Sequence, residues 1–341
     1  MRYLGSKTNL LGEIREMVQT VAPSSHTFCD IFAGTGVVGR EFKTSHRVTA
    51  NDILYFSYVM NVAYTGLKEQ PKFLKLVKEI GLDPIDFLNG PNLVVENPSD
   101  KDFMYTHFSP EGSERRQYLS AENALRIDRI RQTLDLWHEH NLIIEEEKHY
   151  LLCSLIEEVP SVSNTTGTYG AYLKHWDRRA LKPLTLRHLA IEPTREDNEI
   201  FNADANDLIH KISGDVLYVD TPYNGRQYSK NYHLLETLAR YDNPEIRGVT
   251  GLRADSRGDS QYCKRASVYE SFDSLVGNAD FKTVILSYSS DGLLSEEQLV
   301  EILTRHGRAS SLNFKKIPYR RYKRASNDQR SVLEYLIAVN K

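Results

Sequence analysis

The tetrapeptide Asp220-Thr221-Pro222-Tyr223 follows four apolar or aromatic residues, 216–219, that are typical of a buried strand. Ligands bind beyond the carboxyl ends of the strands in open α/β sheets. If the substrate is an exocyclic amino group on a base, Asp220 and a neighbouring backbone carbonyl can accept its hydrogens and direct the nitrogen lone pair at a methyl donor. Pro222 removes a competing backbone donor, and the Tyr223 ring can stack on a base that has left its helix. The alternative is an ordinary turn, because Asp and Pro are common turn residues.

A glycine-rich turn supplies a second candidate site. Gly34, Gly36 and Gly39 form a G-x-G-x-x-G pattern after an apolar strand, and Asp52 follows about 20 residues after the loop begins. This spacing indicates a nucleoside cofactor whose ribose is bound by the acid, and it leaves NAD and S-adenosylmethionine (SAM) both open. Asp30, just before the glycines, is unfavourable beside a pyrophosphate but suits the cationic amino-acid end of SAM. A tight turn without a ligand is the remaining alternative.

Four motifs, in order along nearly the whole chain, resemble those of the Dam-like, alpha-class DNA adenine-N6 methyltransferases. They are "RYLGSK" (2–7), "DIFAGTG" (30–36) followed by Asn51-Asp52, "NADANDLI" (202–209) and "DTPY" (220–223). Thr221 departs from the first proline of the family's D-P-P-Y, as in one branch of type II modification enzymes. The departure slightly weakens the inference of a rigid turn, while Asp220, Pro222 and Tyr223 are kept.

The resemblance implies roles for individual residues. The cofactor SAM would be bound by Tyr3, Lys7, Asp30, Phe32, Gly34, Gly36, Asp52, Asp204 and Asp220. Asp220, Pro222 and Tyr223 would be the catalytic residues, acting on an adenine flipped out of double-stranded DNA. A cognate restriction endonuclease would be the functional partner, and no metal is implied.

Two basic segments could contact DNA phosphates, which adds affinity without sequence information. Residues 305–324 contain eight Lys or Arg and no acid, and residues 171–190 contain five against one acid. The expected DNA-binding residues are Lys174, Arg178, Arg179, Lys316, Arg320, Arg321 and Lys323. A solvated basic face is the alternative for each segment taken alone.

The periodicity of the chain predicts the elements that would position these residues. Alternating helices and strands in residues 1–55 and 200–341 predict an α/β, Rossmann-like SAM-dependent methyltransferase sheet. Residues 56–199 are expected to form a mainly helical inserted target-recognition domain, with helices over 120–140 and 145–159. Residues 242–265 are polar and predict a mobile loop.

The composition of the 341 residues limits the remaining possibilities. The net charge is only −3, so charge alone does not indicate nucleic acid binding. Three scattered cysteines and no paired histidine spacing predict neither a metal site nor disulfides, as in the reducing cytoplasm. The chain shows no signal peptide and no apolar run of membrane-spanning length. We therefore expect a cytoplasmic protein without a membrane partner.

The sequence predicts a type II modification enzyme that methylates adenine N6 within a short DNA site. Methylation of cytosine N4, RNA or a protein glutamine would use the same D-T-P-Y chemistry. A nicotinamide-dependent oxidoreductase could use the glycine loop, although no hydride-site arrangement of His, Tyr or Lys is evident. A non-enzymatic DNA-binding regulator would bind DNA without responding to SAM.

Overall fold

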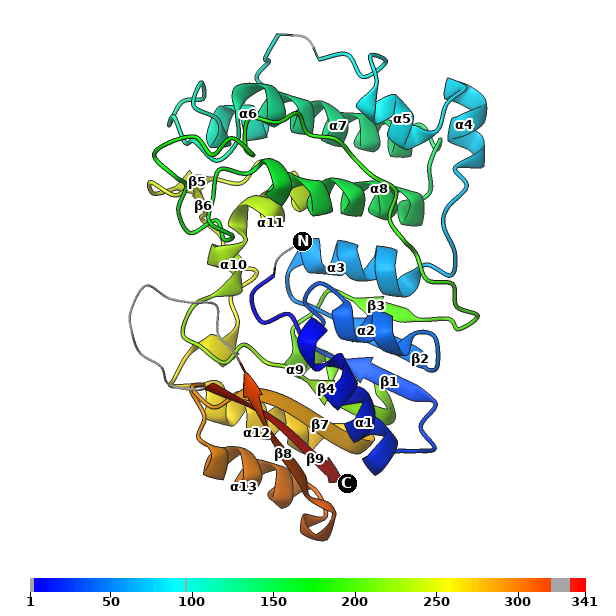
Figure 1. Ribbon diagram of the computed structural model, residues 1–341, viewed down its shortest axis with the longest axis vertical. Coiled ribbons are helices and arrows are strands. Elements are labelled where there is room, and N and C mark those ends of the chain that lie inside the picture. The colour runs from blue at the N-terminus through cyan, green and yellow to red at the C-terminus, as the bar shows by residue number, and fades with distance from the viewer. Residues whose placement is uncertain (1–2, 96, 320–331) are drawn as a thin grey trace. The chain divides into compact units, whose positions relative to one another are not determined.

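The computed structural model describes residues 3–95, 97–319 and 332–341, and the chain forms two compact units (Figure 1). The first unit contains the N-terminal residues up to Gly5, Leu54–Thr194 and Tyr228–Gly258. The second unit contains Ser6–Ile53, Arg195–Gln227 and Asp259–Lys341. Both units are therefore built from segments that are discontinuous in sequence.

The second unit is built on a seven-stranded sheet in the order β3-β2-β1-β4-β7-β9-β8. Its strands are β1 (Thr27–Asp30), β2 (Arg47–Asn51), β3 (Glu199–Phe201), β4 (Ser213–Val219), β7 (Asp280–Ser289), β8 (Asn313–Tyr319) and β9 (Val332–Asn340). The first five strands in the sheet order are parallel, whereas β9 is antiparallel to both of its neighbours. This sheet confirms the predicted α/β, Rossmann-like fold.

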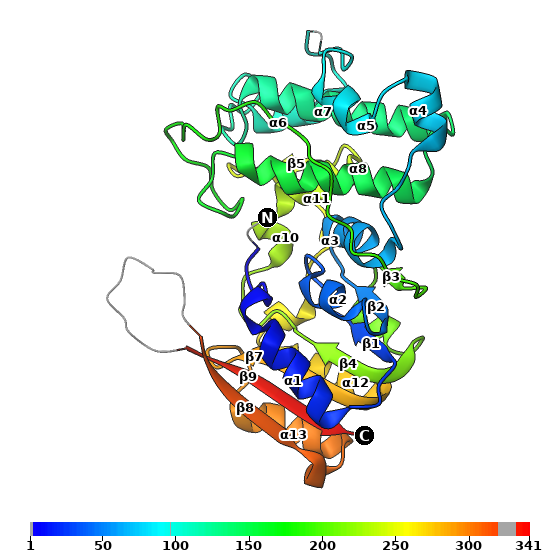
Figure 2. The same ribbon diagram turned by 45° about the vertical axis from the view of Figure 1, so that its right-hand side comes forward.

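Helices cover both faces of the sheet (Figure 1, Figure 2). They are α1 (Leu11–Val21) and α2 (Val37–Phe42) on one face, and α9 (Ala205–Leu208), α12 (Val268–Asn278) and α13 (Glu296–His306) on the other. Because side chains alternate along a strand, β4 contributes to both cores. Val216 and Tyr218 pack with α1 and α2, whereas Leu217 and Val219 pack with α12 and α13. The apolar run before the D-T-P-Y motif is thus the central, fully buried strand of the sheet.

The N-terminus of α13 (Glu296–His306) follows the sequence pattern closely. Ser295 is the N-cap, and it forms a capping box with Gln298, as predicted.

Short 3-10 turns occur at Thr8–Leu10, Val159–Val162, Gln261–Cys263 and Ala309–Ser311.

The first unit is mainly helical. Its helices are α3 (Tyr55–Asn61), which continues into a π-helical turn (Val62–Gly66), α4 (Leu74–Ile80), α5 (Pro84–Asn89), α6 (Phe103–Phe108), α7 (Ala121–Glu139), α8 (Glu145–Glu158), α10 (Tyr228–Asn231) and α11 (His233–Arg240). The two long helices α7 and α8 lie where the sequence predicts them. Ile127, Ile130, Leu134 and Trp137 are buried on one side of α7, so Trp137 is a core residue as expected.

The boundaries of the two units differ in two places from the expected domains. The N-terminal residues up to Gly5, which we expected in the catalytic domain, belong to the first unit. The middle segment of the first unit, Leu54–Thr194, ends close to the expected insertion at 56–199. The segment Tyr228–Gly258, which we expected in the catalytic domain, belongs to the first unit instead. The role of the first unit in target recognition stays a prediction.

Residues 242–265 differ from the loop that the sequence predicts. β5 (Ile246–Arg247) and β6 (Leu252–Arg253) form an antiparallel hairpin, turned through Gly248 and Gly251 with φ values of 70° and 73°. Its base carries ion pairs among charged residues that the sequence pattern presents only as polar composition. None of the helices in the described parts of the chain is both long enough and apolar enough to cross a membrane.

Candidate active site at the strand ends

The D-T-P-Y turn leaves the carboxyl end of β4 in the second unit. Asp220 is the first residue after the strand, Thr221 is buried, and Pro222 and Tyr223 are half-buried. The backbone carbonyl of Tyr223 accepts a hydrogen bond of 2.9 Å from the amide of Leu293. The Tyr223 ring meets Tyr288 of β7 edge-on, with 6.3 Å between the ring centroids. The turn is therefore held by β7 and the loop that follows it.

A buried ion cluster surrounds the carboxylate of Asp220. The Lys7 ammonium lies 3.0 Å from Asp220 Oδ1 and 2.7 Å from Glu334 Oε1. Glu334 belongs to β9, and its Oε1 also accepts a hydrogen bond of 2.8 Å from the Ser287 hydroxyl on β7. The Lys7 side chain is 5% exposed, that of Glu334 6% and that of Asp220 17%, so water screens these contacts less than at the surface. One ammonium thus serves two carboxylates, and we call Lys7, Asp220 and Glu334 the strand-end cluster.

Burial has the largest effect on the pKa of Asp220. It raises the pKa of Asp220 to about 7; Lys7 opposes the rise and Glu334 adds to it. Burial disfavours the charged form of Lys7, but the carboxylates of Asp220 and Glu334 outweigh it and hold the pKa of the ammonium above its ordinary value. Asp220 therefore changes charge near neutral pH, which is typical of a functional carboxylate.

The glycine-rich turn connects β1 to α2 in the geometry that the pattern predicts. Gly34 and Gly36 have φ values of 52° and 78°, a backbone conformation that favours glycine. Gly36 is the N-cap of α2, and Gly39 is buried within the helix. Phe32, between the strand and the glycines, is half-buried and meets Tyr262 edge-on at 4.9 Å.

Asp30 ends β1 beside this turn and is buried at 2% exposure. Its Oδ1 is buried and has no hydrogen-bond partner among the described residues. Burial raises the pKa of Asp30 well above its ordinary value, and the negative charges of Asp220 and Asp52 raise it further. A cation placed against Oδ1 would satisfy this oxygen and relieve the repulsion. The residue therefore fits the ammonium group of an amino-acid-like ligand.

Asp52 and Asp204 follow β2 and β3 at the same edge of the sheet. Asp52 Oδ2 accepts a hydrogen bond of 2.8 Å from the Gly34 amide, which fixes the glycine turn. Asp204 is the N-cap of α9 and accepts a hydrogen bond of 2.8 Å from the Asn206 amide. Parallel strands end at one edge of a sheet, so Asp30, Asp52, Asp204 and Asp220 all lie at the ligand-binding edge.

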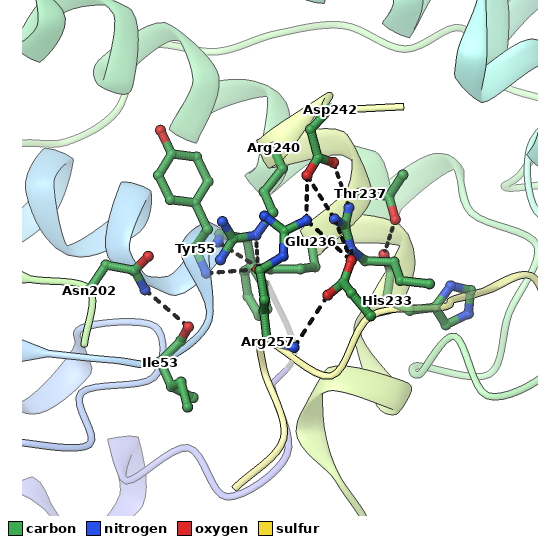
Figure 3. Close-up of polar contacts among 12 residues, drawn as sticks. Ile53, Tyr55, Asn202, His233, Glu236, Thr237, Arg240, Asp242 and Arg257 are labelled. Atoms are coloured by element: carbon green, nitrogen blue, oxygen red, sulfur yellow. Dashed lines mark hydrogen bonds and ion pairs between the residues drawn. The ribbon is translucent and has the colours of Figure 1, made fainter. Parts of the chain in front are cut away.

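Two asparagines tie the loops at this edge together. Asn51 is buried, and its amide donates to the carbonyls of Ile31 and Ala203 at 3.0 and 3.1 Å. Asn202 donates to the carbonyls of Asp52 and Ile53 at 2.7 and 3.0 Å, and Figure 3 shows its bond to Ile53. These bonds fix the backbone that carries the two candidate cofactor acids.

The structure places Tyr3 in the first unit, whereas the other expected cofactor residues belong to the second. The Tyr3 ring stacks on Tyr232 at 4.7 Å and packs against Phe56 and Tyr228. Its role in cofactor binding stays a prediction.

The expected DNA-binding residues fall into four groups. Lys174 and Arg178 are exposed, and Lys316 is ion-paired to Glu296 at 2.7 Å. Arg179 donates to the backbone carbonyls of Pro160, Ser163 and Thr165 at 2.9 to 3.3 Å. Arg320, Arg321 and Lys323 lie outside the described residues.

The sequence reasoning missed Glu334 and Tyr262. Tyr262 is buried against Phe32, and its hydroxyl donates to Asn206 at 2.7 Å. A signal for Glu334 does exist, because it is a lone acid within the otherwise apolar strand "VLEYLIAV". An acid that is buried in a strand requires a partner, but the sequence does not show that this partner is Lys7.

The second unit is a Rossmann-like α/β fold with carboxylates at its strand ends, and comparison with known proteins gives the family of the chain. Residues 3–302 match the family described as D12 class N6 adenine-specific DNA methyltransferase. The chain belongs to this family, as the motif resemblance predicts, and the family implies a methyl donor.

Named relatives extend over the whole chain. It is 46% identical to the type II methyltransferase M.FokI of Planomicrobium okeanokoites, covering 100% of this chain and 53% of that protein. It is 42% identical to the modification methylase StsI of Streptococcus sanguinis, covering 94% of this chain and 49% of that protein. It is 38% identical to the type II methyltransferase M.NlaIII of Neisseria lactamica, covering 100% of this chain and 99% of that protein. The chain thus spans about half of the length of the first two.

Proposed function

We propose that this chain transfers a methyl group from SAM to the N6 amino group of an adenine in double-stranded DNA. The observation that carries the proposal is the strand-end cluster, which puts a buried carboxylate directly after β4 in a chain of the adenine-specific family. The proposed transfer uses no metal ion.

Asp220 accepts one hydrogen bond from the adenine amino group, and the backbone carbonyl beside Pro222 accepts a second. Both bonds draw the nitrogen lone pair out of conjugation with the ring, so that it can attack the methyl carbon while the bond from that carbon to sulfur breaks. The thioether would be the leaving group, and the methylated nitrogen would release one proton to solvent. The half-buried Tyr223 ring stacks on the extruded base. Its fixed backbone, bonded to Leu293, holds the base in line with the carboxylate.

Asp30 binds the ammonium end of the cofactor through the oxygen that has no partner among the described residues. Asp52 binds the ribose, Asp204 reaches the adenine ring, and the backbone of Gly34 and Gly36 allows close approach. Lys7 and Phe32 complete the proposed cofactor site within the second unit. SAM, when bound, supplies an electrophilic methyl group on a positively charged sulfur.

The proposed partner is double-stranded DNA, methylated as part of a type II restriction-modification system. M.FokI and M.NlaIII, which this chain resembles, are named type II methyltransferases. A cognate endonuclease would cut the same site when it is unmethylated. Lys174, Arg178, Arg179, Lys316, Arg320, Arg321 and Lys323 are proposed to contact the DNA, and the helical first unit to recognise the site.

The test is methyl transfer from labelled SAM to mixed-sequence duplex DNA, followed by digestion to nucleosides. We expect label in N6-methyladenine with the wild-type protein and none with Asp220→Ala. Label in N4-methylcytosine would keep methyl transfer and overturn the base assignment. A wild-type protein that labels neither base would overturn the proposed function.

A further inference from the structure

The C-terminal strand β9 brings a charged side chain to the D-T-P-Y turn from the antiparallel side of the sheet. Glu334 is 4% exposed, and the Lys7 ammonium is 2.7 Å from its Oε1. The Ser287 hydroxyl donates to the same oxygen at 2.8 Å. Burying a carboxylate is unfavourable unless it is paired and hydrogen-bonded. Two donors on one oxygen fix the position of the Glu334 carboxylate.

Lys7 is the cation that the two acids share. Its ammonium lies between Asp220 and Glu334, at 3.0 and 2.7 Å. An ammonium has three N–H donors and can serve both carboxylates at once. Without Glu334, the Lys7 ammonium would pair with Asp220 alone. It would then occupy the lone pairs of the Asp220 oxygens that have to accept a hydrogen bond from the target amino group.

We propose that Glu334 is a positioning residue for methyl transfer: it holds Lys7 away from a one-to-one ion pair with Asp220, so that Asp220 remains a strong acceptor for the target amino group. The inference rests on the proposed function. It assigns to β9 a part in the reaction, although β9 lies far from the D-T-P-Y motif in sequence.

The charges around Asp220 predict the direction in which the pH dependence of activity should shift when Glu334 is changed. In the described parts of the chain, Asp220 interacts electrostatically with Lys7, Glu334, Asp30 at the end of β1 and the Tyr218 phenol of β4. Burial raises the pKa of Asp220 to about 7, and the charge of Glu334 contributes to that rise while Lys7 opposes it. The ionised form of Asp220 is the acceptor, so activity should fall as the pH drops below about 7. Removing the charge of Glu334 should move this fall to lower pH.

The decisive variant is Glu334→Gln, which keeps the shape of the side chain and removes its charge. We expect kcat to fall by about tenfold or more at pH 8, because small misplacements at a reacting centre have large effects. The KM for SAM should change less than kcat, and the acid limb of the pH–rate profile should move to lower pH. Glu334→Asp, which keeps the charge on a shorter side chain, should return the acid limb toward the wild-type position.

The matched control is Asp215→Asn. Asp215 is also a carboxylate paired with a lysine, Lys282 at 2.7 Å, but it lies near the other end of β4. This variant should unfold at a lower temperature and keep the wild-type pH–rate profile. Ser287→Ala removes only the hydroxyl that fixes Glu334, and it should lower kcat severalfold without moving the acid limb.

The outcomes separate the inference from the function on which it rests. A wild-type protein that methylates no adenine overturns the proposed function, and Glu334 then has no transfer to position. A wild-type protein that methylates adenine, with a Glu334→Gln variant that keeps its kcat and acid limb, overturns the role of Glu334 alone. If Glu334→Gln does not fold, an unchanged kcat in Ser287→Ala overturns it as well.

Discussion

The strand-end cluster of the second unit and the ion pairs at the base of the hairpin in the first unit balance charge differently. In the strand-end cluster, Lys7 faces both Asp220 and Glu334, and all three side chains are largely buried. At the hairpin, Arg253 and Arg257 are each paired with both Asp242 and Asp255, at 2.6 to 3.2 Å. We call these four residues the hairpin cluster.

The protonation of the acids follows from this difference. Burial opposes ionisation of Asp242, yet Arg253 and Arg257 outweigh it and lower its pKa to about 2. Asp220 is more deeply buried than Asp242 and shares its one cation, Lys7, with Glu334, and its pKa is about 7. Figure 3 shows how Arg257 reaches Asp242. In the hairpin cluster, two arginines neutralise two acids and stabilise the loop. In the strand-end cluster, one lysine serves two acids, so Asp220 is not fully neutralised and can accept a hydrogen bond from a substrate.

Lys7→Met should produce the largest change among the variants that sharpen this comparison. Without the ammonium, two buried carboxylates face each other, so Asp220 should stay protonated to higher pH. We expect activity at pH 7 to fall by roughly a hundredfold and to recover partly at higher pH. The pH–rate profile checks this, because its acid limb should move upward, opposite to that of Glu334→Gln. A downward shift would contradict the assignment of the cluster.

Asp30→Asn should weaken SAM binding by roughly ten- to hundredfold, since a hydrogen bond to a charged group contributes about 1.5–3 kcal/mol. Calorimetric titration measures the change. The control ligand is 5′-methylthioadenosine, which lacks the ammonium group and should bind both proteins equally. An equal loss of affinity for both ligands would mean that Asp30 supports the fold of the turn rather than the ammonium.

Asp242→Asn should lower stability and leave methyl transfer unchanged. We expect the free energy of unfolding to fall by about 1–2 kcal/mol, between the values for exposed ion pairs and for hydrogen bonds to charged groups. The pKa of Asp242 is lowered to about 2 from about 3.9 in unfolded chains, so its contribution is complete above that range and lost as the pH falls toward 2. Denaturant unfolding at several pH values should show the difference from wild type shrinking below pH ~4. A variant with a lowered kcat would contradict a purely structural role.

Arg178→Ala should have the smallest effect. Arg178 is exposed, and losing one phosphate contact should reduce the slope of log affinity against log salt by about 0.9. The matched variant is Arg179→Ala, whose guanidinium bonds three backbone carbonyls in its own unit. We expect that variant to be less stable, in thermal unfolding, than Arg178→Ala. A salt slope that is unchanged in Arg178→Ala would remove this residue from the DNA contacts.

Much of the second unit could be predicted because its signals are local. An apolar strand, a glycine turn that needs positive φ and an acid at the strand end lie within a few residues of one another, as at Asp30 to Gly36. The capping box of α13 is equally local. These patterns determine both the fold class and the candidate cofactor acids.

The strand-end cluster could not be predicted, because its members come from distant parts of the chain. Lys7 and Glu334 are separated by 327 positions. They meet because β9 pairs with β7 and also packs against α1, which follows Lys7 in the chain. The hairpin cluster was missed for a related reason. Its alternating Arg and Asp residues are typical of a solvated loop by composition, and their pairing depends on the turn between β5 and β6.

The most direct test of the account is single-turnover methyl transfer to duplex DNA, at saturating SAM, by wild type, Asp220→Asn and Asp242→Asn. The account predicts N6-methyladenine at the same rate from wild type and Asp242→Asn, and a loss of at least a hundredfold in Asp220→Asn with the fold intact. N6-methyladenine formed at the wild-type rate by Asp220→Asn would contradict it, because the acceptor that the strand-end cluster holds would then not be needed.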